Sequence, residues 1–170
     1  MNRSGIAISL VVLLSAMALQ AQSSSQKSFD SIKALAGNWE GKTQMGGAVN
    51  VSYRLTAGGS AIMSEIVSTM NGKSEDMITM FNLDGDRFLL THYCAAGNQP
   101  RMKASASPDG KTVTFDFVDG TNLKSSNDPH MYRVIFNFID PNHHTGSNNK
   151  ENRIAIIVVR ITAERIGVTR

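Results

Sequence analysis

Apolar and polar residues alternate along much of the chain with a period of two, which is typical of half-buried β-strands. The alternation is clearest in four segments, and less regular apolar runs that predict further strands lie at 61–69, 77–83 and 154–161. The residues on the predicted inner face of the four clear strands are Val49, Val51, Tyr53 and Leu55; Phe88, Leu90, His92 and Cys94; Val113, Phe115 and Phe117; and Tyr132, Val134, Phe136 and Phe138.

Turn signals separate these runs. Asn71-Gly72, Asp84-Gly85 and Asp119-Gly120 supply the positive φ angles that tight hairpins need. Strands joined in this way form an antiparallel meander, and the spacing predicts roughly eight to ten of them. A meander of that length exposes two edges unless it closes, so a closed barrel is favoured over an open sheet.

One segment has helical rather than strand periodicity. Phe29, Ile32 and Leu35 lie on one face of a helix that Ser28 begins and Gly37 ends. The predicted fold is therefore all-β, an antiparallel up-and-down β-barrel with one short N-terminal helix.

The first residues have the organisation of a secretory signal peptide. Residues 6–19 are almost wholly apolar, Arg3 is the only charge before Lys27, and small residues lie close to Ala21. We expect residues 1–21 to be removed after Ala21, leaving a secreted or periplasmic protein without stable membrane insertion. An uncleaved anchor is the alternative.

Composition limits what the mature chain can be. Residues 22–27 are polar and rich in serine, which predicts a tether, and residues 28–170 have the length of a single domain. The chain has one cysteine, which excludes a disulfide framework and a cysteine-rich zinc site. With 41% hydrophobic and 18% charged residues, it is not a disordered protein.

A Gly-x-Trp motif follows the predicted helix, at Gly37-Asn38-Trp39. Together with Thr91-His92-Tyr93-Cys94 and the segment 97–102 (GNQPRM), it resembles the calycins, which include lipocalins, fatty-acid-binding proteins and haem-binding nitrobindins. More closely, residues 30–145 resemble a family of secreted bacterial lipocalin-like proteins of unknown function. The resemblance implies that Trp39 packs at the closed end of a barrel, and it implies no activity.

The C-terminal part departs from that resemblance. An acidic, aromatic strand containing Glu-Trp is expected after Phe138, yet residues 146–153 contain no aromatic residue. Residues 22–144 hold 11 basic and 12 acidic residues, whereas residues 145–170 hold five basic and two acidic ones. Residues 146–170 are therefore a divergent or frameshifted tail by hypothesis, which leaves closure of the barrel open. The basic residues are not interleaved with aromatic ones, so no nucleic-acid partner is expected.

A barrel of this strand number can hold one small ligand, and we expect a small hydrophobic or amphipathic one. Tyr53, His92 and Arg101 would fix its polar end, because an arginine at the mouth can pair with a ligand carboxylate. The candidate pocket residues are Tyr53, Phe88, Leu90, His92, Arg101, Phe115, Phe117, His130, Tyr132, Val134 and Phe136.

Two alternatives remain at this stage. His92 or His130 could ligate haem or serve an enzyme, since imidazole suits haem iron, although hydrogen-bonded structural histidines are the simpler explanation of both. No motif for catalysis is present, no metal site is expected, and adjacent His143 and His144 point to opposite faces of a strand. The other alternative is a structural or interaction domain whose interior is filled by its own side chains.

Overall fold

The computed structural model describes residues 22–43, 46–70, 72–125, 127–149 and 161–165. The predicted signal peptide and most of the final apolar run lie outside these residues. The described chain contains a helix α1 (Ser24–Lys33) and a single 3-10 turn η1 (Ala57–Gly59). Its strands are β1 (Gly37–Lys42), β2 (Ala48–Thr56), β3 (Ala61–Met70), β4 (Lys73–Asp84), β5 (Arg87–Tyr93), β6 (Gln99–Ala106), β7 (Thr112–Thr121), β8 (Arg133–Asp140), β9 (His143–Asn149) and β10 (Ile161–Arg165).

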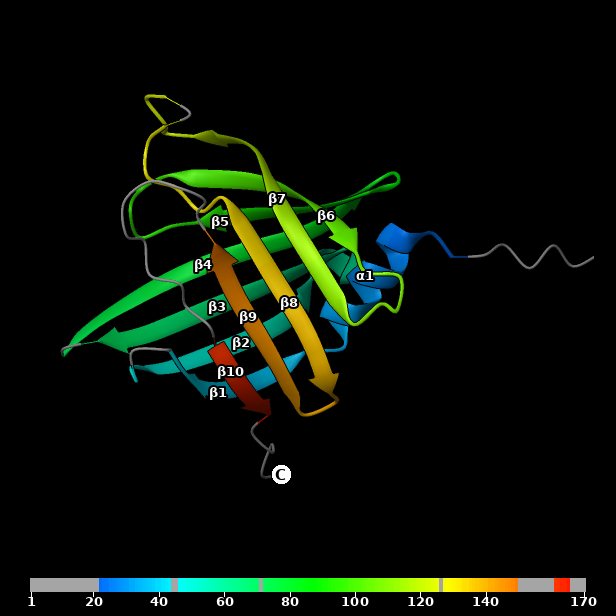
Figure 1. The fold of residues 1–170 in the computed structure, drawn as a ribbon, viewed down its shortest axis with the longest axis horizontal. Helices are drawn as coiled ribbons and strands as arrows, with labels where there is room; N and C mark the ends of the chain where they lie inside the picture. Colours follow the sequence, from blue (N-terminus) through cyan, green and yellow to red (C-terminus); the bar gives the residue numbers. More distant parts are fainter. Residues whose placement is uncertain (1–21, 44–45, 71, 126, 150–160, 166–170) are drawn as a thin grey trace, which may run out of the picture.

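The strands form a closed antiparallel barrel (Figure 1). Each strand pairs with its neighbours in chain order, and β1 pairs with both β2 and β10. This confirms the predicted all-β, up-and-down barrel with one short N-terminal helix. The barrel follows from the sequence because hairpin turns connect strands whose inner faces are apolar.

β10 supplies the closing strand. Its register places Trp39 opposite Arg165 on one side and Gly146 opposite Ile161 on the other. The segment that departs from the calycin resemblance therefore contributes the strand on which closure depends. Residues 150–160 and 166–170 lie outside the described residues, so the hypothesis of a frameshift is not tested.

Helix α1 begins at Ser24, four residues before the predicted start. Ser23 caps it, because its side chain accepts a hydrogen bond from the Gln26 amide at 3.2 Å. Most of the predicted tether is therefore helical. The helix also ends earlier than predicted, at Lys33, and Gly37 instead begins β1 with a φ of 134°.

Helix α1 covers the end of the barrel where β4 turns into β5, and the Ser25 hydroxyl donates to the Asp86 carbonyl there at 2.6 Å. Phe29 of the helix meets Phe88 edge to face, with 5.6 Å between ring centroids. Trp39 is fully buried at this end, and its Nε1 donates to the Leu35 carbonyl at 2.7 Å. The helix therefore closes this end with apolar side chains.

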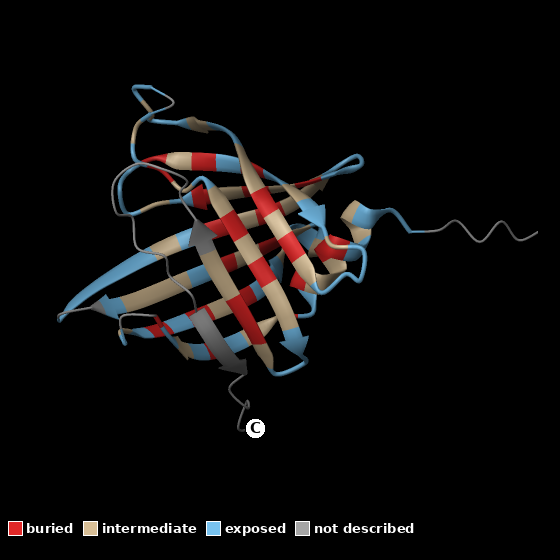
Figure 2. Cartoon of the chain, in the orientation of Figure 1, coloured by how far each residue is buried: buried red, intermediate tan, exposed pale blue. Residues whose placement is uncertain are grey.

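Aromatic rings fill the interior next to the helix. Phe81, Phe88, Phe115 and Phe136 pack with ring centroids 5.0–6.2 Å apart, mostly edge to face. Buried positions alternate with more exposed ones along the strands (Figure 2), as the sequence predicts for strands with one inner face. This half of the barrel is a solid core.

Phe115 sits at the centre of this ring cluster, so Phe115→Ala should lower the free energy of unfolding by about 3–5 kcal/mol. Urea denaturation followed by the fluorescence of Trp39 measures the change. Val118→Ala on the same strand, at a residue 60% exposed, is the control and should stay within about 0.5 kcal/mol. Equal effects of the two substitutions would show that the rings do not form the core.

Candidate functional site

Beside these rings the barrel interior contains a cavity. The cavity has a volume of about 90 Å³ and lies among β2, β3, β4, β5, β8 and β9. Its apolar lining is Val51, Ile66, Met77, Phe81, Leu90, Met131, Val134 and Phe136, and the remaining lining residues are Tyr53, Ser64, Ser68, Thr79, His92, His144, Gly146 and Ser147. The described side chains therefore leave part of the barrel interior unfilled.

The cavity widens from a buried floor toward solvent. Phe81 and Leu90 at the floor are each 1% exposed, whereas Ser68, Met77 and Ser147 at the other end are partly exposed. These three residues lie toward the turn between β3 and β4, at the end of the barrel opposite α1. Among the described residues, the lining is thus most exposed at the end that the helix does not cover.

His92 is the most constrained polar group on the wall. It is 1% exposed, and it faces Thr79 across the β4–β5 pair, with 2.9 Å between Nδ1 and the threonine Oγ1. Its Nε2 is buried without a hydrogen-bond partner. Burial lowers the pKa of His92 to about 4, so the imidazole is neutral at physiological pH.

The unpaired Nε2 can act as donor or acceptor. The Thr79 hydroxyl can donate to Nδ1 or accept from it, and its choice sets which nitrogen of His92 carries the proton. A buried polar atom without a partner costs about 1–3 kcal/mol, and native proteins leave few of them. This atom therefore marks the position where a bound molecule would complete a hydrogen bond.

A second polar pair lies across the cavity. The Tyr53 hydroxyl is 3.3 Å from His144 Nε2, and the His144 ring packs edge to face against Trp39 at 4.4 Å. Burial raises the pKa of Tyr53, against a smaller opposite effect of a hydrogen bond with Ser64, so the phenol stays protonated. Tyr53 is thus a neutral polar member of the wall.

His144 is a lining residue that the sequence did not identify. His143 and His144 do lie on opposite faces, as expected: His143 Nδ1 contacts Asp140 at 2.8 Å outside the barrel, and His144 is 2% exposed inside it. The inner positions of β9 continue with Gly146, which carries no apolar signal. In the structure, His144 pairs with Phe138 on β8.

The predicted pocket residues divide into three groups. Tyr53, Leu90, His92, Val134 and Phe136 line the cavity. Phe88 and Phe115 belong to the solid core beneath it. The four that lie elsewhere are Arg101, Phe117, His130 and Tyr132.

Arg101 is on the outer face of β6, because its neighbours Pro100 and Met102 are the buried residues of that strand. Its guanidinium forms two hydrogen bonds with Asp119, one of them at 2.7 Å between Nη2 and Oδ2. The hydrogen bond and charge of Asp119 raise the pKa of Arg101. The expectation that Arg101 holds a ligand carboxylate is therefore corrected: this charge is already paired, outside the barrel.

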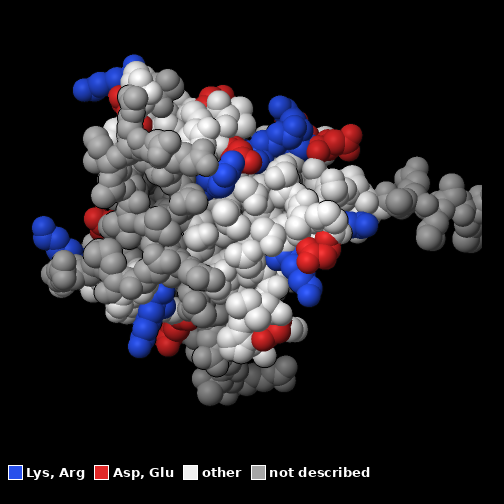
Figure 3. Space-filling model, in the orientation of Figure 1, with Lys and Arg blue, Asp and Glu red and all other residues white. Residues whose placement is uncertain are grey.

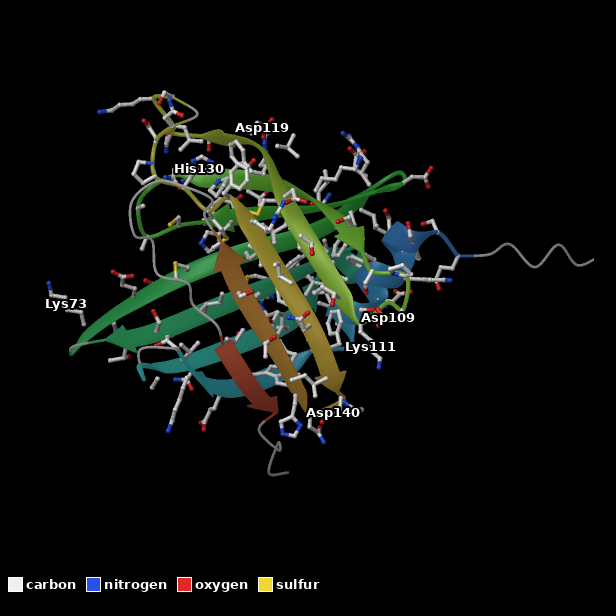
Figure 4. All side chains as sticks on the ribbon, viewed as in Figure 1. Lys73, Asp109, Lys111, Asp119, His130 and Asp140 are labelled. Carbon is white, nitrogen blue, oxygen red and sulfur yellow. The ribbon has the colours of Figure 1, made fainter. Side chains whose placement is uncertain are left out.

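His130 and Tyr132 precede β8, which begins at Arg133, so strand alternation does not place them in the cavity. Tyr132 is 41% exposed. His130 is buried 4.2 Å from the ring of Phe117, and its Nδ1 donates to the Asp128 carbonyl at 2.6 Å (Figure 4). His92 and His130 are not brought together on the cavity wall.

The described residues contain no group of three or more His, Cys, Asp or Glu side chains placed to hold a metal ion. Haem is larger than a drug-sized ligand, for which pockets span roughly 300–1,000 Å³. The cavity of about 90 Å³ does not fit it. Cys94 follows the end of β5, where its Sγ accepts from the Ala96 amide at 3.5 Å, and it does not line the cavity with His92.

A scan against protein-family models found no match, and a search of curated proteins found no similar sequence. Within the described residues, no helix has the length and apolar character needed to span a bilayer. The barrel-like fold is thus established by the structure, and the arguments about function rest on the cavity.

The protonation of His92 should make the barrel sensitive to acid. Its pKa is about 4 in the folded protein against 6.5 in the unfolded chain, so the unfolded chain takes up the proton first as the pH falls. The contribution of His92 to stability is complete above pH 6.5. It is lost between pH 6.5 and pH 4, by up to about 3 kcal/mol in the free energy of unfolding.

Urea denaturation from pH 7.5 to pH 4 measures this loss. His92→Gln should flatten the decline, because the group that titrates is removed, whereas Val118→Ala on the outer face removes no titratable group and should keep the wild-type slope. Parallel curves for the wild type and His92→Gln would contradict the assignment.

Proposed function

We propose that this barrel binds a small, mostly apolar molecule in its interior and fixes one polar group of that molecule on His92. The observation that carries the proposal is the buried, unpartnered Nε2 of His92 on the wall of an otherwise largely apolar cavity. Such cavities with few convergent polar groups are the usual form of small-molecule sites.

The size of the cavity limits the ligand. About 90 Å³ is less than the roughly 150 Å³ of an engineered apolar cavity that takes up benzene. The buried part of the ligand is therefore a short alkyl chain or a compact group, and any longer part extends through the open end beside Ser68 and Met77. A binding protein without catalysis fits this wall better than an enzyme, because within the described part of the chain the hydroxyl hydrogen-bonded to His92 is that of Thr79, a side chain that is itself buried in the wall.

We also propose that this barrel belongs to the secreted lipocalin-like family. A Gly-x-Trp motif at the start of β1, a short helix across one end and a buried Trp39 support membership of the secreted lipocalin-like barrels. Such a protein would act outside the cytoplasm, in the periplasm or the medium, after removal of residues 1–21.

Export should leave a mature protein that begins at Gln22. Intact mass measurement of the protein recovered outside the cytoplasm tests this, because cleavage after Ala21 gives a defined mass difference. Substituting Ala21 with a bulky residue is the control and should reduce processing. Recovery of the full-length chain in the membrane fraction would favour an uncleaved anchor.

Gly146 offers a way to close the cavity without disturbing the fold. It lines the cavity in strand β9, its φ is not in the left-handed region, and an added Cβ would meet no atom within 4 Å. Gly146→Val should therefore fold normally, since a β-branched residue suits a strand, while it occupies the space that a ligand needs.

Binding of 1-hexanol to isotope-labelled protein, followed by NMR shift changes, tests the proposal. We expect a dissociation constant in the micromolar to millimolar range, as ligand-efficiency limits allow for about seven heavy atoms, with shifts centred on His92 and Thr79. Gly146→Val should abolish these shifts, and Thr69→Val at an exposed position of β3 should not. Saturable binding that survives Gly146→Val would place the ligand elsewhere.

A further inference from the structure

The cavity wall carries no charged side chain among the described residues. The strands β3, β4 and β8 contribute no titratable group, and the titratable groups that line it are Tyr53, His92 and His144. On β10 the register places Ile161, Ala163 and Arg165 opposite Gly146, His144 and Trp39, and Trp39 does not line the cavity. The described lining thus offers hydrogen bonds but no counter-charge.

The charges of the barrel lie on its outside. Arg101 pairs with Asp119 and Arg133 pairs with Asp116, and all four side chains are at least one third exposed. Figure 3 shows the Lys, Arg, Asp and Glu side chains distributed over the outer surface of the view. None of these charges lines the cavity, so none can compensate an ion that enters it.

From this lining we propose that the site selects uncharged ligands, namely alcohols, amides or simple carbonyl compounds, and rejects the corresponding carboxylates. The inference rests on the proposed function of the cavity. A carboxylate would lose its hydration and gain one hydrogen bond from a neutral imidazole, which does not offset the cost of burying a charge. A neutral amide or hydroxyl loses far less and satisfies His92 Nε2.

The protonation states of the wall support this selection. Burial holds the pKa of His92 near 4, so the imidazole does not become a cation that could attract an anion between pH 5 and pH 8. Burial also raises the pKa of Tyr53, so the phenol does not become an anion in that range. Neither His92 nor Tyr53 therefore changes its charge across the physiological range.

The flexibility of the Thr79 hydroxyl sets how narrow the selection is. When Thr79 donates to Nδ1, His92 Nε2 carries a proton and donates a hydrogen bond to a carbonyl oxygen; when Thr79 accepts, Nε2 accepts a hydrogen bond from a hydroxyl or amide. The site can therefore accept donors and acceptors alike. Its discrimination lies in charge rather than in the type of neutral polar group.

Hexanamide and hexanoate form the matched pair that tests the inference, because they have nearly the same shape and differ in charge. At pH 7.5, isothermal titration calorimetry and NMR shift changes on the full mature protein should show hexanamide binding at least roughly a hundredfold more tightly than hexanoate. Gly146→Val should abolish the binding of hexanamide, which locates it in the cavity. His92→Phe should weaken hexanamide about five- to tenfold by removing the hydrogen bond.

A pH series adds a signature that a merely weak carboxylate ligand would not give. Between pH 7.5 and pH 5.5 a growing fraction of hexanoate becomes the neutral acid, so its apparent affinity should rise by several tens of times. The affinity of hexanamide should stay constant over the same range, because His92 does not titrate there.

The outcomes separate the inference from the function on which it rests. Binding of hexanamide with rejection of hexanoate supports both. Equal or tighter binding of hexanoate at pH 7.5 overturns the selection of neutral ligands and leaves a ligand-binding barrel. If hexanamide, 1-hexanol and hexanoate all fail to bind at every pH, the proposed function and the inference are overturned together.

Discussion

Closure of the strand ring is the constraint on which the rest of this structure depends. Because β1 pairs with β2 and with β10, every alternate side chain must point into a space of fixed width. Near α1 that space is filled by rings such as Phe81 and Phe115. Farther from the helix the inner positions carry small residues, among them Ser64 and Gly146, and the same width leaves a cavity. The cavity thus arises because the inner side chains there are small while the width of the barrel stays the same.

The periodicity of the sequence predicted the strands of the barrel, because buried and more exposed residues alternate cleanly in segments such as Val113–Phe117. It located His92 and Tyr53 on the cavity wall for the same reason. It failed at β9, where no apolar residue marks the inner face and His144 went unassigned. The position of Arg101 was also wrong, since the buried neighbours of Arg101 on β6 include a proline that carries no strand signal. The start of α1 depends on the Ser23 cap, a single local hydrogen bond.

One side chain, His92, affects both the stability of the fold and the proposed binding of a ligand. His92 is buried against Thr79 and yet leaves one ring nitrogen without a partner, so the folded protein carries a small cost that a ligand can relieve. A hydrophobic residue at this position would avoid that cost. The half-satisfied histidine is therefore better explained by recognition than by folding, which agrees with the tendency of local rules to be violated at functional sites.

The position of the closing strand has a consequence for how the molecule is made. Trp39 on β1 has its second strand partner at Arg165, so the ring includes contacts between the two ends of the domain. Until the last strand leaves the ribosome, β1 and β9 each have one unpaired edge, and pairing of such distant segments is slow. The barrel therefore cannot close before β10 has left the ribosome, and every earlier stage of synthesis exposes two strand edges that could pair with another chain.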